Sequence, residues 1–157
     1  MTDARRIALE ALTRITAEGR ELDDALADAG IAQAEGRERG FAYTLVMHSL
    51  RWGRAADALL AQYIEKPIPE RKHRAHWALR MGVVQLLVLK VPPHAAVSTT
   101  VALLKKRKPD AAYAGMANAV LKKMAGDGRL DASAALPEWM RMRWERVYGG
   151  QALAAMA

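Results

Sequence analysis

The chain has 157 residues, 52% of them hydrophobic and 6% aromatic, which fits one domain built from helix-forming residues and argues against a sheet protein. It has no Cys, which excludes a disulfide framework and Cys-based zinc sites and agrees with a reducing, cytoplasmic compartment. The formal net charge is +7, with −3 on residues 1–40 and +10 on residues 41–157. The positive charge of the second part attracts polyanions, but such a charge also occurs on ordinary solvated surfaces.

Apolar residues recur at helical spacing and predict an all-α, compact bundle of about seven to nine helices. Glycines and prolines mark the expected breaks, because proline cannot continue a helix and glycine weakens one. Thr2 or Asp3 can cap the first helix. In chain order the predicted helices cover about 4–18, 22–31, 37–52, 54–64, 79–89, 94–106 and 115–124, with a final segment from 137 and breaks at Gly19, Gly53, Pro67, Pro69, Pro92, Pro93 and Pro109.

The most apolar segment, Met81 to Leu89, is interrupted only by Gly82 and Gln85. A helix that spans a bilayer needs roughly 20 apolar residues, so this run is too short for that role. It predicts instead a helix that its neighbours bury on most sides. The first twelve residues are too polar and charged for an export signal, and we expect no membrane association.

Two groups of cations lie near predicted helix ends. Lys105, Lys106, Arg107 and Lys108 are consecutive, and they can either stabilise the negative end of a helix dipole or bind phosphates. Lys122 and Lys123 close the next helix, and we expect them in the same region if the two helices are antiparallel.

A third group surrounds a tryptophan. Arg51 and Arg54 flank Trp52, which can stack on an unpaired base, although its spacing from Phe41 favours packing in the core. Arg37 and Arg39 begin the same helix, where cations oppose the helix dipole. The candidate RNA-binding residues are therefore Arg37, Arg39, Arg51, Arg54, Lys105, Lys106, Arg107, Lys108, Lys122 and Lys123.

His73 and His76 have the i, i+3 spacing of a possible metal-ligand pair. No Cys and no carboxylate pair at ligand spacing accompanies them, so the sequence predicts no metal site and no catalytic residue.

Four segments taken together resemble the NusB family of helical RNA-binding domains. Their order and spacing fit the family across most of the chain. They are RERGFAYTLVMHSLRWGRAADALL (residues 37–60), LRMGVVQLL (79–87), VPPHAAVSTTVALLKK (91–106) and GMANAVLKKM (115–124).

Within that family the chain is most similar to the N-terminal domain of Sun/Fmu-type ribosomal RNA cytosine-5 methyltransferases. The similarity is carried by Arg51-Trp52, by PHAAV (residues 93–97) and by the PEWM…RW…YG tail (residues 137–149). Ser98-Thr99-Thr100 departs from the family, which more often has an Asn-Glu pair there. The resemblance implies a binding domain at 1–135 and a helical extension at 136–157, including QALAAMA, that leads toward a separate catalytic domain.

The resemblance implies that the chain captures ribosomal RNA and that the catalytic domain, with S-adenosylmethionine as cofactor, methylates it. The chain itself has no Cys to supply the thiolate that attacks the base, and no Gly-rich cofactor loop, so we expect no catalysis and no cofactor here. Two alternatives stay open. One is an antitermination factor that binds boxA RNA together with a ribosomal protein, and the other is a helical protein-interaction module without an RNA role.

Overall fold

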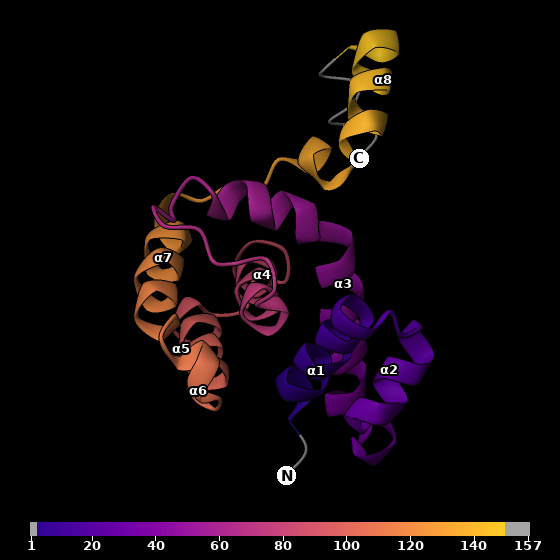
Figure 1. Ribbon diagram of the computed structural model, residues 1–157, viewed down its shortest axis with the longest axis vertical. Coiled ribbons are helices and arrows are strands. Elements are labelled where there is room, and N and C mark those ends of the chain that lie inside the picture. The colour runs from indigo at the N-terminus through magenta and orange to yellow at the C-terminus, as the bar shows by residue number, and fades with distance from the viewer. Residues whose placement is uncertain (1–2, 150–157) are drawn as a thin grey trace.

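The computed structural model describes residues 3–149 and confirms the all-α prediction, with eight α-helices, two short 3-10 helices and no strand in that range (Figure 1). Thr2 and the predicted QALAAMA helix lie outside the described residues. The elements are α1 (Ala4–Glu18), α2 (Leu22–Ala29), η1 (Ile31–Gln33), α3 (Gly36–Leu60), α4 (His73–Leu87), α5 (Pro93–Lys105), α6 (Lys108–Ala111), α7 (Ala114–Asp127), η2 (Ala132–Ala135) and α8 (Glu138–Tyr148).

Helix α4 lies at the centre of the bundle, as its apolar sequence predicts. It packs against α1, α3, α5 and α7, and the run from Met81 to Leu86 is entirely buried. The one polar side chain of this run, Gln85, accepts a hydrogen bond from Arg5 Nε of α1 at 2.7 Å, so its burial does not leave the carbonyl unsatisfied. No helix among residues 3–149 is long and apolar enough to cross a membrane.

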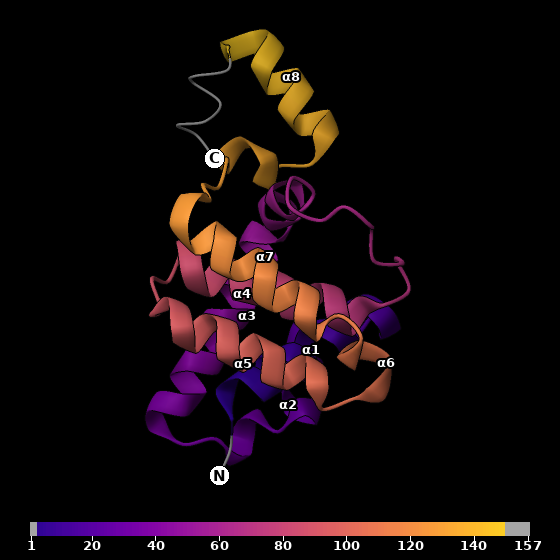
Figure 2. The same cartoon turned by 90° about the vertical axis from the view of Figure 1, so that its left-hand side faces the viewer.

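Helices α5 and α7 cover one side of α4 and lie side by side (Figure 2). The single short helix α6 joins them, which makes the pair antiparallel. The α5–α7 pair approaches α4 closely at Gly82. A Cβ atom on Gly82 would lie 2.9 Å from both Leu121 Cδ1 of α7 and Thr100 Oγ1 of α5, closer than real Cβ contacts.

Two expected breaks are wrong. The helix that begins near Arg37 does not stop at Gly53 but continues to Leu60 as one helix of 25 residues. Gly53 is buried in α3 against the Trp77 ring, and one interior glycine costs a helix only about 1 kcal/mol, less than the packing of a long apolar face supplies. Pro109 lies in the first turn of helix α6, which begins at Lys108, because proline fits the first turn of a helix.

Helix α8 extends away from the bundle as an arm and packs chiefly on η2 (Figures 1 and 2). Its Trp139, Met142 and Val147 are exposed at 65%, 54% and 64%. This arrangement agrees with a separate extension, but the boundary between residues 135 and 136 stays a prediction.

The close approach at Gly82 yields a stability prediction. We expect Gly82→Ala to lower the free energy of unfolding by about 1–2 kcal/mol, because overpacking a filled core outweighs the better helix propensity of alanine. Gly40→Ala is the matched control, since an added Cβ there meets nothing within 4 Å. It should raise stability by about 0.5–1 kcal/mol. Urea denaturation followed by circular dichroism measures both, and equal effects of the two substitutions would contradict the packing argument.

Candidate nucleic-acid interface

Trp52 forms the wall of a surface hollow of about 460 Å³, which we call the Trp52 hollow. The expectation that Trp52 packs in the core is wrong. Its side chain is half-buried and is not among the core residues of the described part of the chain, to which Trp77 belongs, but lines the hollow with Leu87 and Leu130 at the edge of that core. The lining is Trp52 of α3, Leu87 and Val88 at the end of α4, Lys90, and Gly128, Arg129 and Leu130 after α7.

Two further hollows follow the Trp52 hollow, one adjoining it and the next adjoining that one. The first, of about 370 Å³, shares Lys90 and Arg129 with it and passes Pro92 and Pro93. The second, of about 530 Å³, shares Pro93 with the first and lies between α5 and α7. We call the three together the α7 groove. Its last part is lined by Pro93, His94, Val97, Ser98, Val101, Asn118, Lys122 and Ala125.

Exposed cations follow the α7 groove from end to end. Lys90 and Arg129 line its first two parts and Lys122 lines the third. Arg51 is exposed beside the groove, and its guanidinium lies 5.8 Å from the centre of the Trp52 ring, within the range of a cation–π contact. The groove therefore combines an aromatic wall with a line of positive charge.

One carboxylate also lines the α7 groove. Asp127 accepts a hydrogen bond of 2.7 Å from the Tyr63 hydroxyl, which joins the C-terminal end of α7 to the segment after α3. That hydrogen bond, with smaller contributions from burial and from the carboxylate charge, raises the pKa of Tyr63 above its ordinary value. Asp127 is thus engaged by a protein group and offsets only one of the groove's cations.

The structure separates the two lysine groups that we expected together. Lys105 ends α5 beside α6, whereas Lys122 lines a hollow with Pro93 and His94 at the start of α5. The expectation of a single patch is wrong because antiparallel helices place the end of one beside the start of the other. All six side chains, Lys105, Lys106, Arg107, Lys108, Lys122 and Lys123, are exposed.

The arginines at the start of α3 have different surroundings. Arg39 donates its Nε and Nη2 to the carbonyl oxygens of Ala34 and Ala32, at 3.0 and 3.2 Å, and so fixes the turn between η1 and α3. Arg37 and Arg54 are exposed on α3. Arg39 thus has a structural role that the sequence did not indicate.

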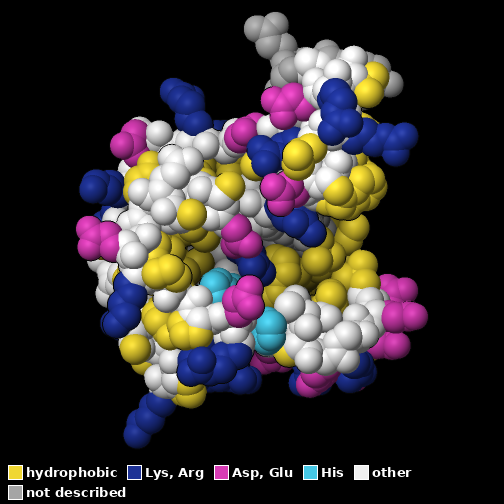
Figure 3. Space-filling model, turned by 45° about the horizontal axis from the view of Figure 1, so that its top comes forward, with side chains coloured by type: hydrophobic (Ala, Val, Ile, Leu, Met, Phe, Trp, Pro, Cys, Tyr) yellow, Lys and Arg dark blue, Asp and Glu magenta, His cyan; other side chains and the backbone are white. Residues whose placement is uncertain are grey.

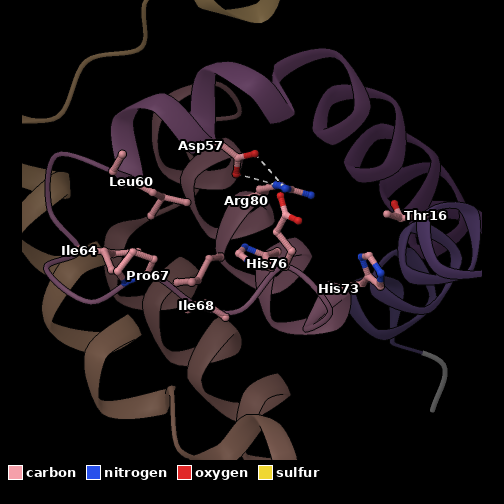
Figure 4. Close-up of a pocket in the computed structure, with 12 residues that line it drawn as sticks. Thr16, Asp57, Leu60, Ile64, Pro67, Ile68, His73, His76 and Arg80 are labelled. Atoms are coloured by element: carbon pink, nitrogen blue, oxygen red, sulfur yellow. Dashed lines mark hydrogen bonds and ion pairs between the residues drawn. The ribbon is translucent and has the colours of Figure 1, made fainter.

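A separate hollow of about 500 Å³ lies between α3, the α3–α4 connection and α4 (Figures 3 and 4). Arg80 Nε and Nη2 donate to the two carboxylate oxygens of Asp57 at 2.7 and 2.9 Å along its wall. His73 and His76 line it too, and His76 Nε2 lies 3.1 Å from the Pro69 carbonyl oxygen. Within residues 3–149 no three His, Cys, Asp or Glu side chains gather as metal ligands. This hollow is lined by both acidic and basic side chains, so it suits a polyanion less well than the α7 groove does.

Sequence reasoning missed Lys90 and Arg129, since each is an isolated cation in the sequence. The sequence does contain a signal for Lys90. It lies between the end of the apolar run and the double proline, where a helix commonly ends on glycine, so a lysine there is unusual. Nothing in the sequence singles out Arg129.

The NusB family model matches residues 2–126 of the chain. Curated relatives named "Ribosomal RNA small subunit methyltransferase B" include the protein of Xanthomonas campestris pv. campestris, 33% identical over 95% of this chain and 34% of its own length. That of Thermus thermophilus is 36% identical over 75% of this chain and 29% of its own length.

The chain thus spans about a third of the length of these relatives. The family match covers α1 to α6 and all of α7 except its last residue. It therefore includes the central α4 and the antiparallel α5–α7 pair that frames the groove. The all-α bundle, the four resembling segments and this match agree, and the chain belongs to the NusB family.

Proposed function

We propose that the chain is the RNA-binding, non-catalytic domain of a ribosomal RNA methyltransferase. The relatives that support this role are named as methyltransferases of small-subunit ribosomal RNA, which favours it over an antitermination factor. In this role the chain holds ribosomal RNA for a separate catalytic domain, which supplies the reactive thiolate and binds S-adenosylmethionine.

The observation that carries the proposal is that eight exposed cations, without a carboxylate partner in the described part of the chain, lie on the groove and on the α5–α7 pair. Arg6, Arg14, Arg20, Arg74 and Arg80 each form an ion pair with a carboxylate. Within residues 3–149, no such pair is formed by the cations of the groove and of the α5–α7 pair, namely Lys90, Lys105, Lys106, Arg107, Lys108, Lys122, Lys123 and Arg129.

Unpaired, exposed cations are the ones that a phosphate backbone can neutralise. Each such contact releases a counterion bound to the RNA, which is the main source of affinity for nucleic acids. A cation already held by a carboxylate adds little, because binding the phosphate would break the existing pair. The surface around α5 and α7 therefore has the charge that an RNA-binding domain requires.

Neutralising two of these cations tests the proposal. We expect Lys105→Gln with Lys106→Gln to weaken binding to a ribosomal RNA fragment and to lower the slope of log affinity against log salt by about 1.4, or about 0.7 per single-strand phosphate contact. Fluorescence anisotropy at several salt concentrations measures this slope.

Arg143→Gln with Arg146→Gln is the matched control, because it removes the same charge from exposed positions on α8. Its slope should equal that of the unaltered chain. An identical loss in both variants would mean that net charge alone, and no particular surface, governs the affinity.

The non-catalytic role gives a second prediction. Incubated with ribosomal RNA and S-adenosylmethionine, the chain should transfer no methyl group to cytosine, since it has no Cys for nucleophilic attack. Mass spectrometry of RNA digests detects methylcytosine, and a full-length relative serves as the positive control. Methylation by this chain alone would refute the assignment.

A further inference from the structure

We propose that the Trp52 hollow seats one unpaired nucleotide of a single-stranded RNA, with its base against the Trp52 indole and its phosphates on Lys90 and Arg129. This inference rests on the proposed function and names the form of RNA that this part of the surface recognises.

The backbone of Lys90 supplies the first argument. Helices α1 and α2 end on Gly19 and Gly30, whose φ angles of 66° and 95° lie in the left-handed region. The turn after α4 has Lys90 with φ 55°, the one non-glycine residue with positive φ among the described residues. A side chain in this region is strained relative to its preferred conformations, and glycine avoids that strain.

The turn itself requires this conformation. Val91 donates its backbone N–H to the Gln85 carbonyl at 2.8 Å, which turns the chain back over the end of α4 just before Pro92. Folding alone would therefore favour glycine at residue 90. The lysine side chain there is exposed, lines two adjoining hollows and forms no ion pair within residues 3–149, so its charge is available to a ligand.

The shape and lining of the hollow supply the second argument. Its volume of about 460 Å³ lies within the range of about 300–1,000 Å³ that small ligands occupy. Trp52, Leu87 and Leu130 give it apolar walls, and Lys90 and Arg129 are its cations. An aromatic wall with cations beside it is the arrangement by which single-strand-binding proteins stack a base and hold its phosphate.

The hollow favours an unpaired base over a duplex. In an A-form helix the bases are stacked inside, and the flat face of a base cannot reach a side chain. A single strand can turn one base into the hollow and continue along the α7 groove toward Lys122. The proposal thus predicts a preference for single strands that charge alone would not give.

Substitution of the tryptophan tests the stacking. Trp52→Leu should weaken binding of a short oligouridylate by at least about fivefold, since stacking of one base on an aromatic side chain contributes about 1–3 kcal/mol. Trp52→Phe should retain most of the affinity. The oligouridylate should quench the tryptophan fluorescence of the unaltered chain, and Trp52→Phe should abolish that part of the quenching. Circular dichroism verifies that each variant is folded.

Substitution of the lysine separates binding from folding. Lys90→Gly should raise the melting temperature, because glycine relieves the left-handed backbone, and at the same time weaken oligouridylate binding several-fold. A variant with a destabilised fold would change both properties in the same direction. Lys66→Gly, at an exposed residue outside the groove, is the control and should leave oligouridylate binding unchanged.

Two outcomes would overturn the nucleotide seat. One is unchanged oligouridylate affinity in Trp52→Leu, and the other is equal affinity of the chain for oligouridylate and for a blunt RNA duplex of the same charge. In either case, salt-dependent binding that Lys105→Gln with Lys106→Gln weakens would leave the proposed RNA-binding function standing. Absence of binding to any RNA at low salt would refute both.

Discussion

The burial of the run from Met81 to Leu86 in α4 is the constraint on which the rest of the structure depends. A helical run with no face toward water needs neighbours on every side, and α1, α3, α5 and α7 take these places. Small residues allow the close approach, as at Gly82, and Arg5 satisfies the buried amide of Gln85. The chain must then leave this enclosed site through a sharp turn. That turn brings Lys90 to the surface beside Trp52 and so creates the first part of the α7 groove.

Most of the bundle could be predicted because its signals are local. Asp3 caps α1 by accepting the Arg5 N–H, Gly19 ends it in the left-handed region, and the double proline separates α4 from α5. The errors at Gly53 and Pro109 have a common cause. Glycine and proline have only a local preference against the helix interior. Tertiary packing overrides this preference at Gly53, and a position in the first helical turn does so at Pro109.

The candidate site was less predictable, because it is assembled from residues far apart in the sequence. Runs such as Lys105–Lys108 are visible in a sequence, whereas Trp52, Lys90 and Arg129 meet only after α3, α4 and the segment behind α7 have packed. The side chain of Trp52 could not be placed from its helical spacing alone, since that spacing continues past the edge of the core. The separation of Lys105 from Lys122 follows from the opposite directions of α5 and α7, because the end of α7 lies beside the start of α5 and not beside its end.

The arm formed by α8 affects how the protein behaves in the test tube. Trp139, Met142 and Val147 are exposed apolar side chains on a helix that packs chiefly on η2. At high concentration the protein should self-associate through α8, whatever its affinity for RNA. A version shortened at Leu136 lacks that surface and is the better starting material for crystals or for NMR spectra.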